Sequence, residues 1–458
     1  MAQIGIIGAG PAGLAAALLA SRKGHNCTVF ESAANPGGMA ASFVVAGQRV
    51  DLGSHRLHPA TEPHLLELIK QIMGDDLQIR ERNGRINLRE RWVKFPLRAT
   101  DLMRKLPTNV ALRIGGETLT KRFRNSVETN FYESVQHRLG PTVAQEFYGP
   151  FAKKLYGVEP HQLTVEIAQR RIAATSGFDV IRKIVKATRS SGRVFLYPRD
   201  GYGSISERLA DAAHDAGTEL CFNSPITKLQ AKKDSVAITS AGRILEFEQV
   251  WSTIPSPNLL AITEPSPPLK TIEDARSLRN RAMVLVYLVI PRPQYTPFDA
   301  HYIPTTETII SRLSEPKNYR DGRDPSNQTV LCAELPCWKG DMIWNASPGE
   351  LGDLVSEDLQ KMGLPDPQYI HVELKFLPSV YPVFEHSTSQ ARTTTQLASQ
   401  SINRVVSFGR HGLGVPDNLH HVMRMGEHLV NSVSSDGKLD SSKWDEALGS
   451  FTKHVVED

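Results

Sequence analysis

The chain has 458 residues, of which 40% are hydrophobic and 22% charged, with a formal net charge of +4. This length exceeds what one ordinary hydrophobic core supports, so we expect two or three packed domains of a globular protein. The mild positive charge does not predict nucleic-acid binding. It fits a pocket that prefers an anionic ligand, and basic side chains scattered over the surface explain it equally well.

The cysteines and the apolar runs exclude several other classes. Cys27, Cys221, Cys332 and Cys337 are too few for a disulfide framework and lack the spacing of a zinc site. The apolar run over residues 4–20 is broken by glycines and a proline, which argues against a signal peptide. No apolar run is long enough to span a bilayer. We therefore predict a cytoplasmic protein that does not contact membranes.

The first forty residues carry the strongest pattern. Residues 3–7 predict a buried strand, residues 14–23 an Ala/Leu-rich helix, and residues 27–31 a second strand, which together form a right-handed βαβ unit. The first connection reads Gly8-Ala9-Gly10-Pro11-Ala12-Gly13. In such a turn the first glycine permits the bend, the second lets the backbone approach a pyrophosphate, and the third lets the helix pack on the strand. The N–H groups and dipole of the helix start then bind phosphate.

An acidic residue completes this motif. Glu31 ends the second strand, where a carboxylate accepts hydrogen bonds from both ribose hydroxyls and repels a 2′-phosphate. Ser32 follows it and is assigned to the same site. The order of strand, glycine turn, helix, strand and acid predicts a bound dinucleotide. A glycine-rich turn without a ligand is the alternative.

The motif alone does not distinguish FAD from NAD, but the next residues do. Gly37 and Gly38, followed by Met39, let the chain run past the pyrophosphate and ribityl region of a longer cofactor. The span from Glu31 to Ser42 resembles the extended fingerprint of the FAD-dependent amine oxidase and protoporphyrinogen oxidase superfamily. This resemblance implies FAD as the cofactor. No Cys or His matches an attachment pattern, so we expect noncovalent binding.

Downstream elements are predicted from periodicity and turn signals. We expect a helix over residues 61–74, a hairpin over 85–89 and 91–96, and a mostly helical insertion over 98–190. Ser204 is the expected N-cap of a further helix, followed by strands at 219–222, 236–239, 249–253 and 283–290 and a proline-rich loop at 255–268. From Val405 the pattern of strand, glycine turn and helix repeats, and the last twenty residues are expected to be peripheral.

These elements predict an α/β fold with a doubly wound, Rossmann-like FAD-binding domain, a β-sheet substrate domain and a helical insertion. The FAD-binding domain is expected to combine residues 1–60, 191–262 and 396–458. Residues 61–190 form the first part of the substrate domain with the helical insertion, and residues 263–395 form the substrate-binding sheet.

Later segments extend the resemblance. Asp51 to His55, with Gly53 and Ser54, resembles a segment that lies close to the flavin, and the strand containing Ile226 matches one that meets the adenine side. The Gly409-Arg410 turn resembles one that touches the flavin. The helix that begins near Asn418 and Leu419 then directs its N-terminus at the pyrimidine end of the ring, where its dipole stabilises negative charge on reduced flavin.

The segments around Tyr302, Arg312 and Tyr381 are similar to those of UDP-galactopyranose mutases and their relatives. The mutase pattern has a tyrosine that contacts the sugar nucleotide where this chain has Pro416, and an acid where it has His420. These two departures put the mutase reaction in doubt, although the cofactor part of the motif is kept.

Four side chains are candidates for substrate chemistry. His55 can orient substrate or take a proton, because its ordinary pKa lies near neutral; a histidine that only shapes the loop is the alternative. Arg312 can bind a phosphate or carboxylate with two hydrogen bonds, unless it forms only a surface salt bridge. Tyr302 and Tyr381 either flank the pocket or only pack. Strand-like alternation of side chains predicts that Arg56 faces away from His55.

Neither a histidine group near the C-terminal turn nor a basic hairpin is interpreted as an additional binding site. His411, His420 and His421 lie where the resemblance places flavin contacts, so we expect no metal there. Arg82, Arg85, Arg89 and Arg91 form a basic hairpin that we interpret as a solvated face and not a nucleic-acid site.

The predicted function is an FAD-dependent oxidase or dehydrogenase that transfers a hydride from a small polar metabolite to flavin N5. A sugar, an amino sugar or a biosynthetic intermediate fits, and the basic candidates suggest an anionic or nucleotide-linked substrate. The alternatives are a redox-neutral mutase of a nucleotide sugar and a catalytically silent FAD-binding protein. The sequence leaves open whether the chain is a monomer or a homodimer.

Overall fold

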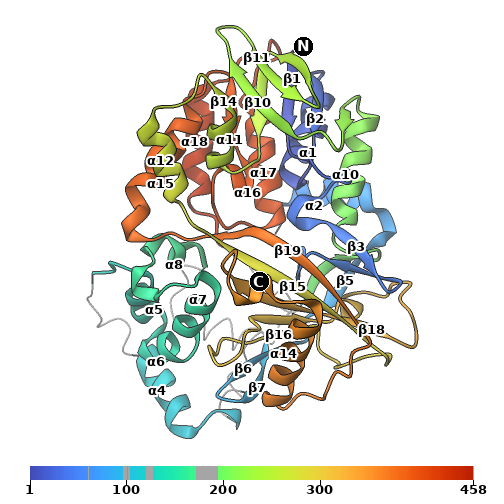
Figure 1. Cartoon of the computed structure of the whole chain (residues 1–458), viewed down its shortest axis with the longest axis vertical. Coiled ribbons are helices and arrows are strands. Elements are labelled where there is room, and N and C mark those ends of the chain that lie inside the picture. The colour runs from blue at the N-terminus through green and yellow to red at the C-terminus, as the bar shows by residue number, and fades with distance from the viewer. Residues whose placement is uncertain (60, 96–100, 102–103, 120–126, 172–193, 457–458) are drawn as a thin grey trace.

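The computed structural model describes the chain except for residues 60, 96–100, 102–103, 120–126, 172–193 and 457–458. Two halves meet near the middle of the molecule (Figure 1). The upper half carries the chain's N-terminus and a parallel sheet, and the lower half carries a larger mixed sheet with helices on its left side.

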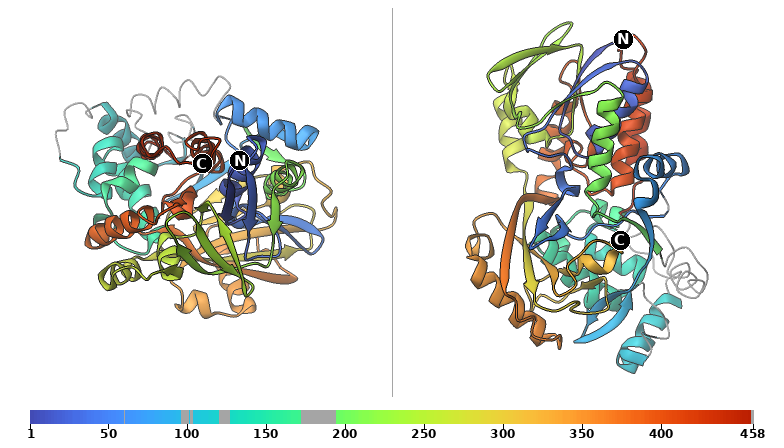
Figure 2. Two further views of the ribbon diagram at one scale, coloured as in Figure 1. Left: turned by 90° about the horizontal axis from the view of Figure 1, so that it is seen from above. Right: turned by 90° about the vertical axis from the view of Figure 1, so that its right-hand side faces the viewer.

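The upper sheet has five parallel strands in the order β20-β13-β1-β2-β9. They are β20 (Val405–Ser407), β13 (Gln249–Ser252), β1 (Gln3–Ile7), β2 (Asn26–Phe30) and β9 (Glu219–Cys221). The helices α1 (Pro11–Arg22), α10 (Ser204–Asp215) and α17 (Leu419–Asn431) pack together on one face. The right view of Figure 2 shows them on one side of the sheet. Burial on both faces explains why these strands are apolar without alternation.

A four-stranded sheet covers the opposite face, in the order β12-β11-β10-β14. Its strands are β10 (Ile226–Ala231), β11 (Val236–Ser240), β12 (Arg243–Phe247) and β14 (Thr263–Glu264). Leu229, Ile238 and Phe247 share one buried cluster with Ile7 and Val250 of the parallel sheet. The layers of helix, parallel sheet and second sheet confirm the predicted α/β, Rossmann-like class.

The lower sheet has seven strands in the order β19-β15-β18-β17-β16-β6-β7. They are β19 (His371–Pro382), β15 (Asn280–Ile290), β18 (Thr329–Cys337), β17 (Arg312–Ser314), β16 (Ala300–Tyr302), β6 (Gly84–Leu88) and β7 (Arg91–Phe95). β16 pairs with β6 in parallel, and the other pairs are antiparallel. The predicted hairpin of residues 85–96 is thus the β6–β7 edge of this sheet.

Strand β15, the second strand from one edge of this sheet, is buried on both faces. Val284 and Val286 pack in the same cluster as the helix α14 (Pro348–Lys361), whereas Leu285 and Tyr287 pack against Val50 on the side of the upper half. Val50 belongs to the hairpin of β3 (Ser42–Val45) and β4 (Gln48–Asp51). The seven-stranded sheet is therefore fixed directly to the segment that follows the glycine-rich turn and Glu31.

Helices fill the left side of the lower half in Figure 1. They are α4 (Thr108–Leu119), α5 (Phe131–Leu139), α6 (Pro141–Val143), α7 (Gly149–Tyr156) and α8 (Val165–Arg171). The described part of the predicted helical insertion is indeed mostly helical, and the rest of that prediction falls outside the described residues. The remaining elements are α2 (Pro63–Met73), β5 (Leu77–Glu81) paired with β8 (Val194–Pro198), α11 (Ser256–Ile262), α12 (Leu269–Ser277), α13 (Met342–Asn345), α15 (Ser389–Gln400), α16 (Gly409–Gly412) and α18 (Ser441–Phe451).

Three local predictions were wrong. Ser204 is not the N-cap of α10: Gly203 holds that position, and the Ser204 hydroxyl donates to the carbonyl of Gly201 at 2.6 Å. The stretch 255–268 is not all loop, because α11 begins directly after Pro255, at positions where a helix tolerates proline. The last twenty residues are not peripheral, since Phe451 of α18 and His454 are buried.

Lys154 of α7 connects the helices of the lower half to the seven-stranded sheet. Its ammonium is buried and donates to Ile303 O at 3.0 Å, to Thr308 Oγ1 at 3.1 Å and to Ile310 O at 2.7 Å. These acceptors lie on the loop between Tyr302 and Arg312, so the lysine positions two predicted site residues at once.

We expect Lys154→Met to lower the free energy of unfolding by about 2 to 3 kcal/mol, because it leaves buried oxygens without a donor. Burial lowers the pKa of Lys154 from 10.5 to about 7. The unfolded chain therefore binds more protons than the folded chain between these pH values, so the stability of the wild type relative to this variant rises with pH across that window. Urea unfolding at several pH values measures both effects.

Lys153→Met is the matched control, because Lys153 is the exposed neighbour on the same helix. Equal urea midpoints for the two variants would contradict a tethering role for Lys154.

Candidate cofactor and substrate site

A cavity of about 460 Å³ runs along the junction of the two halves. Of the residues predicted from the sequence, its lining includes Gly8, Gly10, Pro11, Ala12, Glu31, Ser32, Gly38, Met39, Gly53, Ser54, His55, Ile226, Tyr302, Arg312, Tyr381, Arg410, Asn418 and Leu419. Gly13, Gly37 and Gly409 are not part of the lining. The structure thus brings together the predicted cofactor and substrate residues from both chain ends, and their individual roles stay predictions.

The three glycines of the first turn meet different surroundings. A Cβ on Gly8 would lie 2.2 Å from Thr253 Oγ1, and one on Gly13 would lie 2.0 Å from the carbonyl oxygen of Gly8. A Cβ on Gly10 would meet no atom within 4 Å and would project into open space. Gly8 and Gly13 are therefore required by packing, whereas Gly10 leaves room for a ligand at the start of α1.

Glu31 is held in place by backbone donors at the end of β2. Its Oε2 accepts from Ala9 N at 2.9 Å, and its Oε1 accepts from Ala33 N at 2.9 Å and from Ser32 Oγ at 3.1 Å. The carboxylate therefore lies over the glycine turn with a fixed orientation. The segment that leads to Ile226 runs alongside it, with Ser224 N donating to Glu31 O at 2.8 Å.

The second glycine pair brings the chain back to the first turn. Gly37 has a φ of 126° and donates its N–H to Ala9 O at 2.9 Å. A Cβ on Gly38 would lie 3.5 Å from Gly10 Cα. The Gly409-Arg410 turn also approaches the start of α1, because a Cβ on Gly409 would lie 3.0 Å from Ala12 Cβ. These close approaches bring the three segments predicted to contact the cofactor together at the start of α1.

Buried polar atoms also fit a cofactor. Arg410 Nε and His411 Nε2 have no hydrogen-bond partner among the described residues, although both side chains line the cavity. Asn418 is the N-cap of α17, so the helix directs its N-terminus at the same cavity. Open space at Gly10, two helix N-termini and the fixed Glu31 carboxylate match the needs of a dinucleotide.

His55 is bonded to the backbone. Its Nε2 donates to Leu52 O at 2.8 Å, and its ring stacks on Tyr202 with centroids 5.2 Å apart. Burial lowers the pKa of His55, so the imidazole is neutral at neutral pH. These contacts show that His55 shapes the loop after β4; its action on substrate stays a prediction.

Arg312 forms a largely buried ion pair and not a surface salt bridge. Its Nε and Nη2 both lie 2.8 Å from Glu334 Oε1, and the two side chains are 17% and 3% exposed. The same Glu334 oxygen accepts from Ser54 N at 2.9 Å. Glu334 therefore holds Arg312 of the substrate sheet next to the loop that the resemblance places at the flavin.

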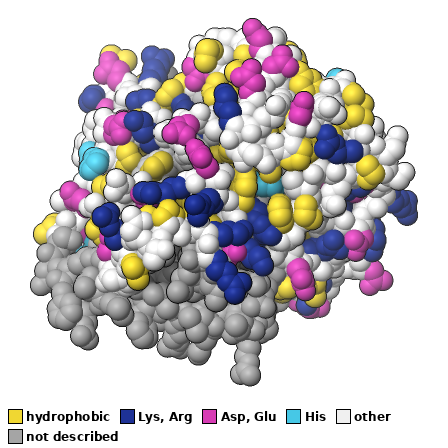
Figure 3. All heavy atoms as spheres, turned by 90° about the horizontal axis from the view of Figure 1, so that it is seen from below, with side chains coloured by type: hydrophobic (Ala, Val, Ile, Leu, Met, Phe, Trp, Pro, Cys, Tyr) yellow, Lys and Arg dark blue, Asp and Glu magenta, His cyan; other side chains and the backbone are white. Residues whose placement is uncertain are grey.

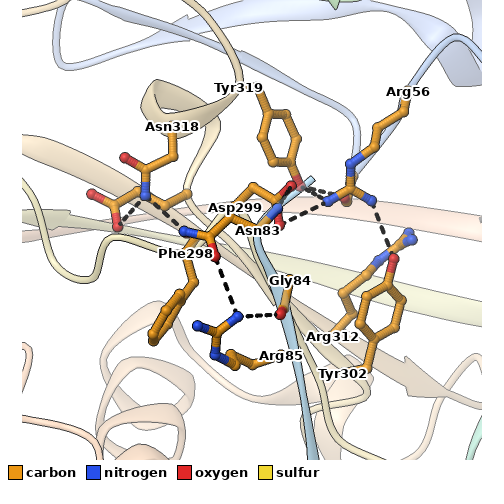
Figure 4. A network of polar contacts seen from close by, with 12 residues as sticks. Arg56, Asn83, Gly84, Arg85, Phe298, Asp299, Tyr302, Arg312, Asn318 and Tyr319 are labelled. Atoms are coloured by element: carbon orange, nitrogen blue, oxygen red, sulfur yellow. Dashed lines mark hydrogen bonds and ion pairs between the residues drawn. The ribbon is translucent and has the colours of Figure 1, made fainter. Parts of the chain in front are cut away.

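Arg56 is a lining residue that sequence reasoning missed, because a strand-like alternation with His55 was assumed. The segment is an irregular loop, and both side chains line the cavity. Arg56 Nη1 donates to Tyr302 OH at 3.1 Å, and Nη2 donates to Tyr319 OH at 3.3 Å and lies 3.5 Å from Asp299 Oδ1 (Figure 4). Although burial acts to lower the pKa of Arg56, these oxygens raise it overall.

Tyr381 lies between two more arginines. The guanidinium carbons of Arg171 and Arg410 are 5.2 Å and 5.8 Å from its ring centroid. Arg410 Nη2 donates to Val380 O at 2.8 Å, which fixes it against the end of β19. Arg171 was also missed from the sequence, because only packing brings the end of α8 to this wall.

Arginines of the basic hairpin contact side chains from other parts of the protein. Arg89 forms an ion pair with Glu146 at 2.6 Å, and the guanidinium of Arg85 lies 3.8 Å from the ring centroid of Phe298. Arg82 lines the cavity. On the face seen from below, Lys and Arg side chains gather in several groups with Asp and Glu among them (Figure 3). The exposed Arg89 and Arg91 fit a solvated face, whereas Arg82 lines the cavity and departs from that interpretation.

Comparison with known proteins identifies the family. The sequence matches the flavin-containing amine oxidoreductases over residues 11–404. The chain belongs to this family. Its cofactor is accordingly FAD, as the sequence predicted, and it shares the expected superfamily with amine oxidases and protoporphyrinogen oxidases.

Curated relatives match only in part. The chain is 41% identical over 70 residues to a 1-hydroxycarotenoid 3,4-desaturase of Flavobacterium sp., covering 15% of this chain and 14% of that protein. It is 25% identical over 280 residues to a Mycobacterium tuberculosis protein named as a flavin-containing monoamine oxidase, covering 58% and 59%. The chain thus spans less than two thirds of the length of these relatives.

Solved structures show the same fold over nearly the whole chain. A reduced UDP-galactopyranose mutase superposes with a TM-score of 0.80 at 20% identity, covering 100% of both chains. A protein of Exiguobacterium named as a protoporphyrinogen oxidase gives 0.73 at 18% identity, covering 94% of this chain and 98% of that one. A putrescine oxidase bound to putrescine gives 0.67 at 14% identity with the same coverage. Among the described residues, no helix has the length and apolar character needed to cross a bilayer.

Substitution of two glycines separates ligand binding from folding. We expect Gly10→Ala to leave the melting temperature of the apoprotein unchanged and to weaken FAD binding at least tenfold, because its methyl group occupies ligand space. Gly13→Ala should instead destabilise the apoprotein by more than about 2 kcal/mol, since its methyl group collides with backbone. Thermal unfolding of apoprotein and fluorescence titration with FAD measure the two effects. Equal FAD affinity in Gly10→Ala and wild type would contradict the placement of the pyrophosphate.

Proposed function

We propose that this chain is an FAD-dependent oxidoreductase that oxidises a small anionic metabolite, such as a sugar, an amino sugar or a biosynthetic intermediate that carries a carboxylate or phosphate. One observation supports the anionic class most directly. Five arginines line the cavity, namely Arg56, Arg82, Arg171, Arg312 and Arg410, against the carboxylates Glu31, Glu334 and Asp417. Glu31 lies at the glycine turn and Glu334 is already paired with Arg312.

The same charges disfavour a cationic amine. Putrescine, which was solved bound to a structurally similar oxidase, carries two positive charges at neutral pH. Placing such a ligand among Arg56, Arg312 and Arg410 costs several kcal/mol of like-charge repulsion. The proposed substrate class therefore differs from that of amine oxidases of the family, although the fold is shared.

The protein's part in the reaction is to bind and orient the substrate. FAD, when bound, supplies the hydride acceptor. We assign anion binding to Arg312, which Glu334 keeps in one orientation, and to Arg56, which Tyr302 and Asp299 keep in place. Tyr302 and Tyr381 flank the substrate, and the neutral His55 supports the loop beneath it.

A redox-neutral mutase of a nucleotide sugar is the second candidate. Two observations favour it: the superposition on UDP-galactopyranose mutase covers both whole chains, and the arginines suit a diphosphate. Pro416 argues against it, because it lines the cavity at the position where the mutase pattern has a substrate-binding tyrosine and offers no hydroxyl.

Anaerobic mixing of the purified holoenzyme with carboxylated sugars, sugar phosphates, nucleotide sugars and amines tests the proposal. An anionic substrate should bleach the oxidised flavin, and air should restore the absorbance. We expect Arg312→Gln to slow bleaching more than a hundredfold with FAD still bound, because a buried charge-assisted contact is lost while Glu334 keeps a donor.

Arg323→Ala is the control, since Arg323 is exposed. Flavin bleaching by amines and by none of the anionic compounds would contradict the proposed anionic substrate class. Isomerisation of a nucleotide sugar only after reduction by dithionite would favour the mutase.

A further inference from the structure

The C-terminal segment from Phe451 to Val456 is built into the cavity wall. Phe451 and His454 are 2% and 6% exposed, and Val456 lines the cavity. Val456 N donates to Arg170 O at 2.8 Å, and Arg170 Nη1 donates back to Phe451 O at 3.3 Å. The segment thus connects α18 of the cofactor half to α8, whose last residue, Arg171, contacts Tyr381.

His454 contacts the turn before α17. Its Nδ1 donates to Asp417 Oδ2 at 3.3 Å, and the Asp417 side chain is fully buried. Asp417 itself lines the cavity, its carbonyl accepts from Arg410 Nη1 at 3.3 Å, and the next residue, Asn418, caps α17. Burial acts to raise the pKa of Asp417, but its contacts with His421 and His454 lower it overall. The carboxylate therefore stays ionised because these histidines compensate its burial.

A metal ion is the obvious alternative, because ligand atoms of Asp417, His421 and His454 all lie within 4.8 Å of one another. The ring geometry excludes it. A metal binds about 2.0 to 2.1 Å from an imidazole nitrogen, in the plane of the ring. The His421 and His454 rings are stacked 4.3 Å apart at 14°, so no point lies in both planes near their nitrogens. His421 Nδ1 also accepts from Asn418 N at 3.3 Å. The cluster is a hydrogen-bonded one.

We propose that His454 is a positioning residue of the FAD site. It holds the Asp417 carboxylate, and through Asp417 it fixes both the Arg410 guanidinium and the start of α17, while Val456 closes the wall between α17 and α8. This role depends on FAD binding in the cavity and is independent of the substrate class proposed above.

The test uses the full-length holoenzyme and two readouts, the Kd for FAD and the midpoint potential of bound FAD. His454→Ala should raise the Kd for FAD about tenfold, because the Arg410 side chain and the start of α17 must then be ordered when FAD binds. Removal of this donor raises the pKa of buried Asp417, because its burial is then less compensated. The resulting loss of negative charge from the cofactor cavity shifts the midpoint potential upward.

Two comparisons show that His454 acts through Asp417. In an Asp417→Asn background, His454→Ala should shift the potential no further, because the charge is already gone. The amide nitrogen of His454→Asn lies near the position of Nδ1, whereas that of His454→Gln lies one methylene further. Asn should therefore restore the Kd to within about twofold of wild type and return the midpoint potential to the wild-type value, and Gln should do neither. This pair keeps the test decisive even where the alanine variant fails to fold.

Lys453→Ala is the matched control in the same segment, since Lys453 is exposed. His454→Ala with the Kd and potential of Lys453→Ala would overturn the proposal, as would an equal potential shift with and without Asp417. The proposal would also be overturned if the protein bound one equivalent of metal and a chelator that removed this metal released FAD. That result would identify the cluster as a metal site.

Discussion

The buried carboxylate of Asp51 is the constraint on which the arrangement of the two halves depends. Its Oδ1 accepts from Ser42 Oγ at 2.6 Å and from Tyr202 N at 2.9 Å, and its Oδ2 accepts from the hydroxyl of Tyr197. Its backbone carbonyl accepts from Tyr287 OH at 2.5 Å. A side chain that is 1% exposed thus joins the β3–β4 hairpin, β8, the approach to α10 and the substrate sheet. A buried charge is tolerated here because every neighbouring element supplies a donor.

This junction also positions the loop that lines the cavity. The loop that follows Asp51 supplies Ser54, His55 and Arg56. Ser54 bonds to Glu334 and Tyr319, His55 bonds to Leu52, and Arg56 bonds to Tyr302 and also to Tyr319. Groups predicted to contact the cofactor and a group proposed to bind substrate therefore share one loop. Movement of the sheet relative to the cofactor half would break several bonds to charged groups at once, so the site is preorganised.

The cofactor half could be predicted because its signal is local. Strand, glycine turn, helix and Glu31 follow one another within forty residues, and each has one physical function. The arginines of the substrate cavity could not be predicted in this way, because Arg56 lies on an irregular loop and Arg171 at a helix end, and only packing brings them together. One usable signal was overlooked: Glu334 stands inside the otherwise apolar strand β18, and a charge in such a strand requires a buried partner.

The strand order of the parallel sheet has a consequence for biosynthesis. β1 pairs with β13, β13 pairs with β20, and α1 packs against α17, so the ends of the chain share one layer. On the ribosome, the first βαβ unit must wait for residues beyond 405 before its sheet and helix layer are complete. Contacts between such distant residues slow folding and leave apolar surface exposed meanwhile. The cavity, which residues from both of these segments line, can therefore form only after the residues beyond 405 have been synthesised.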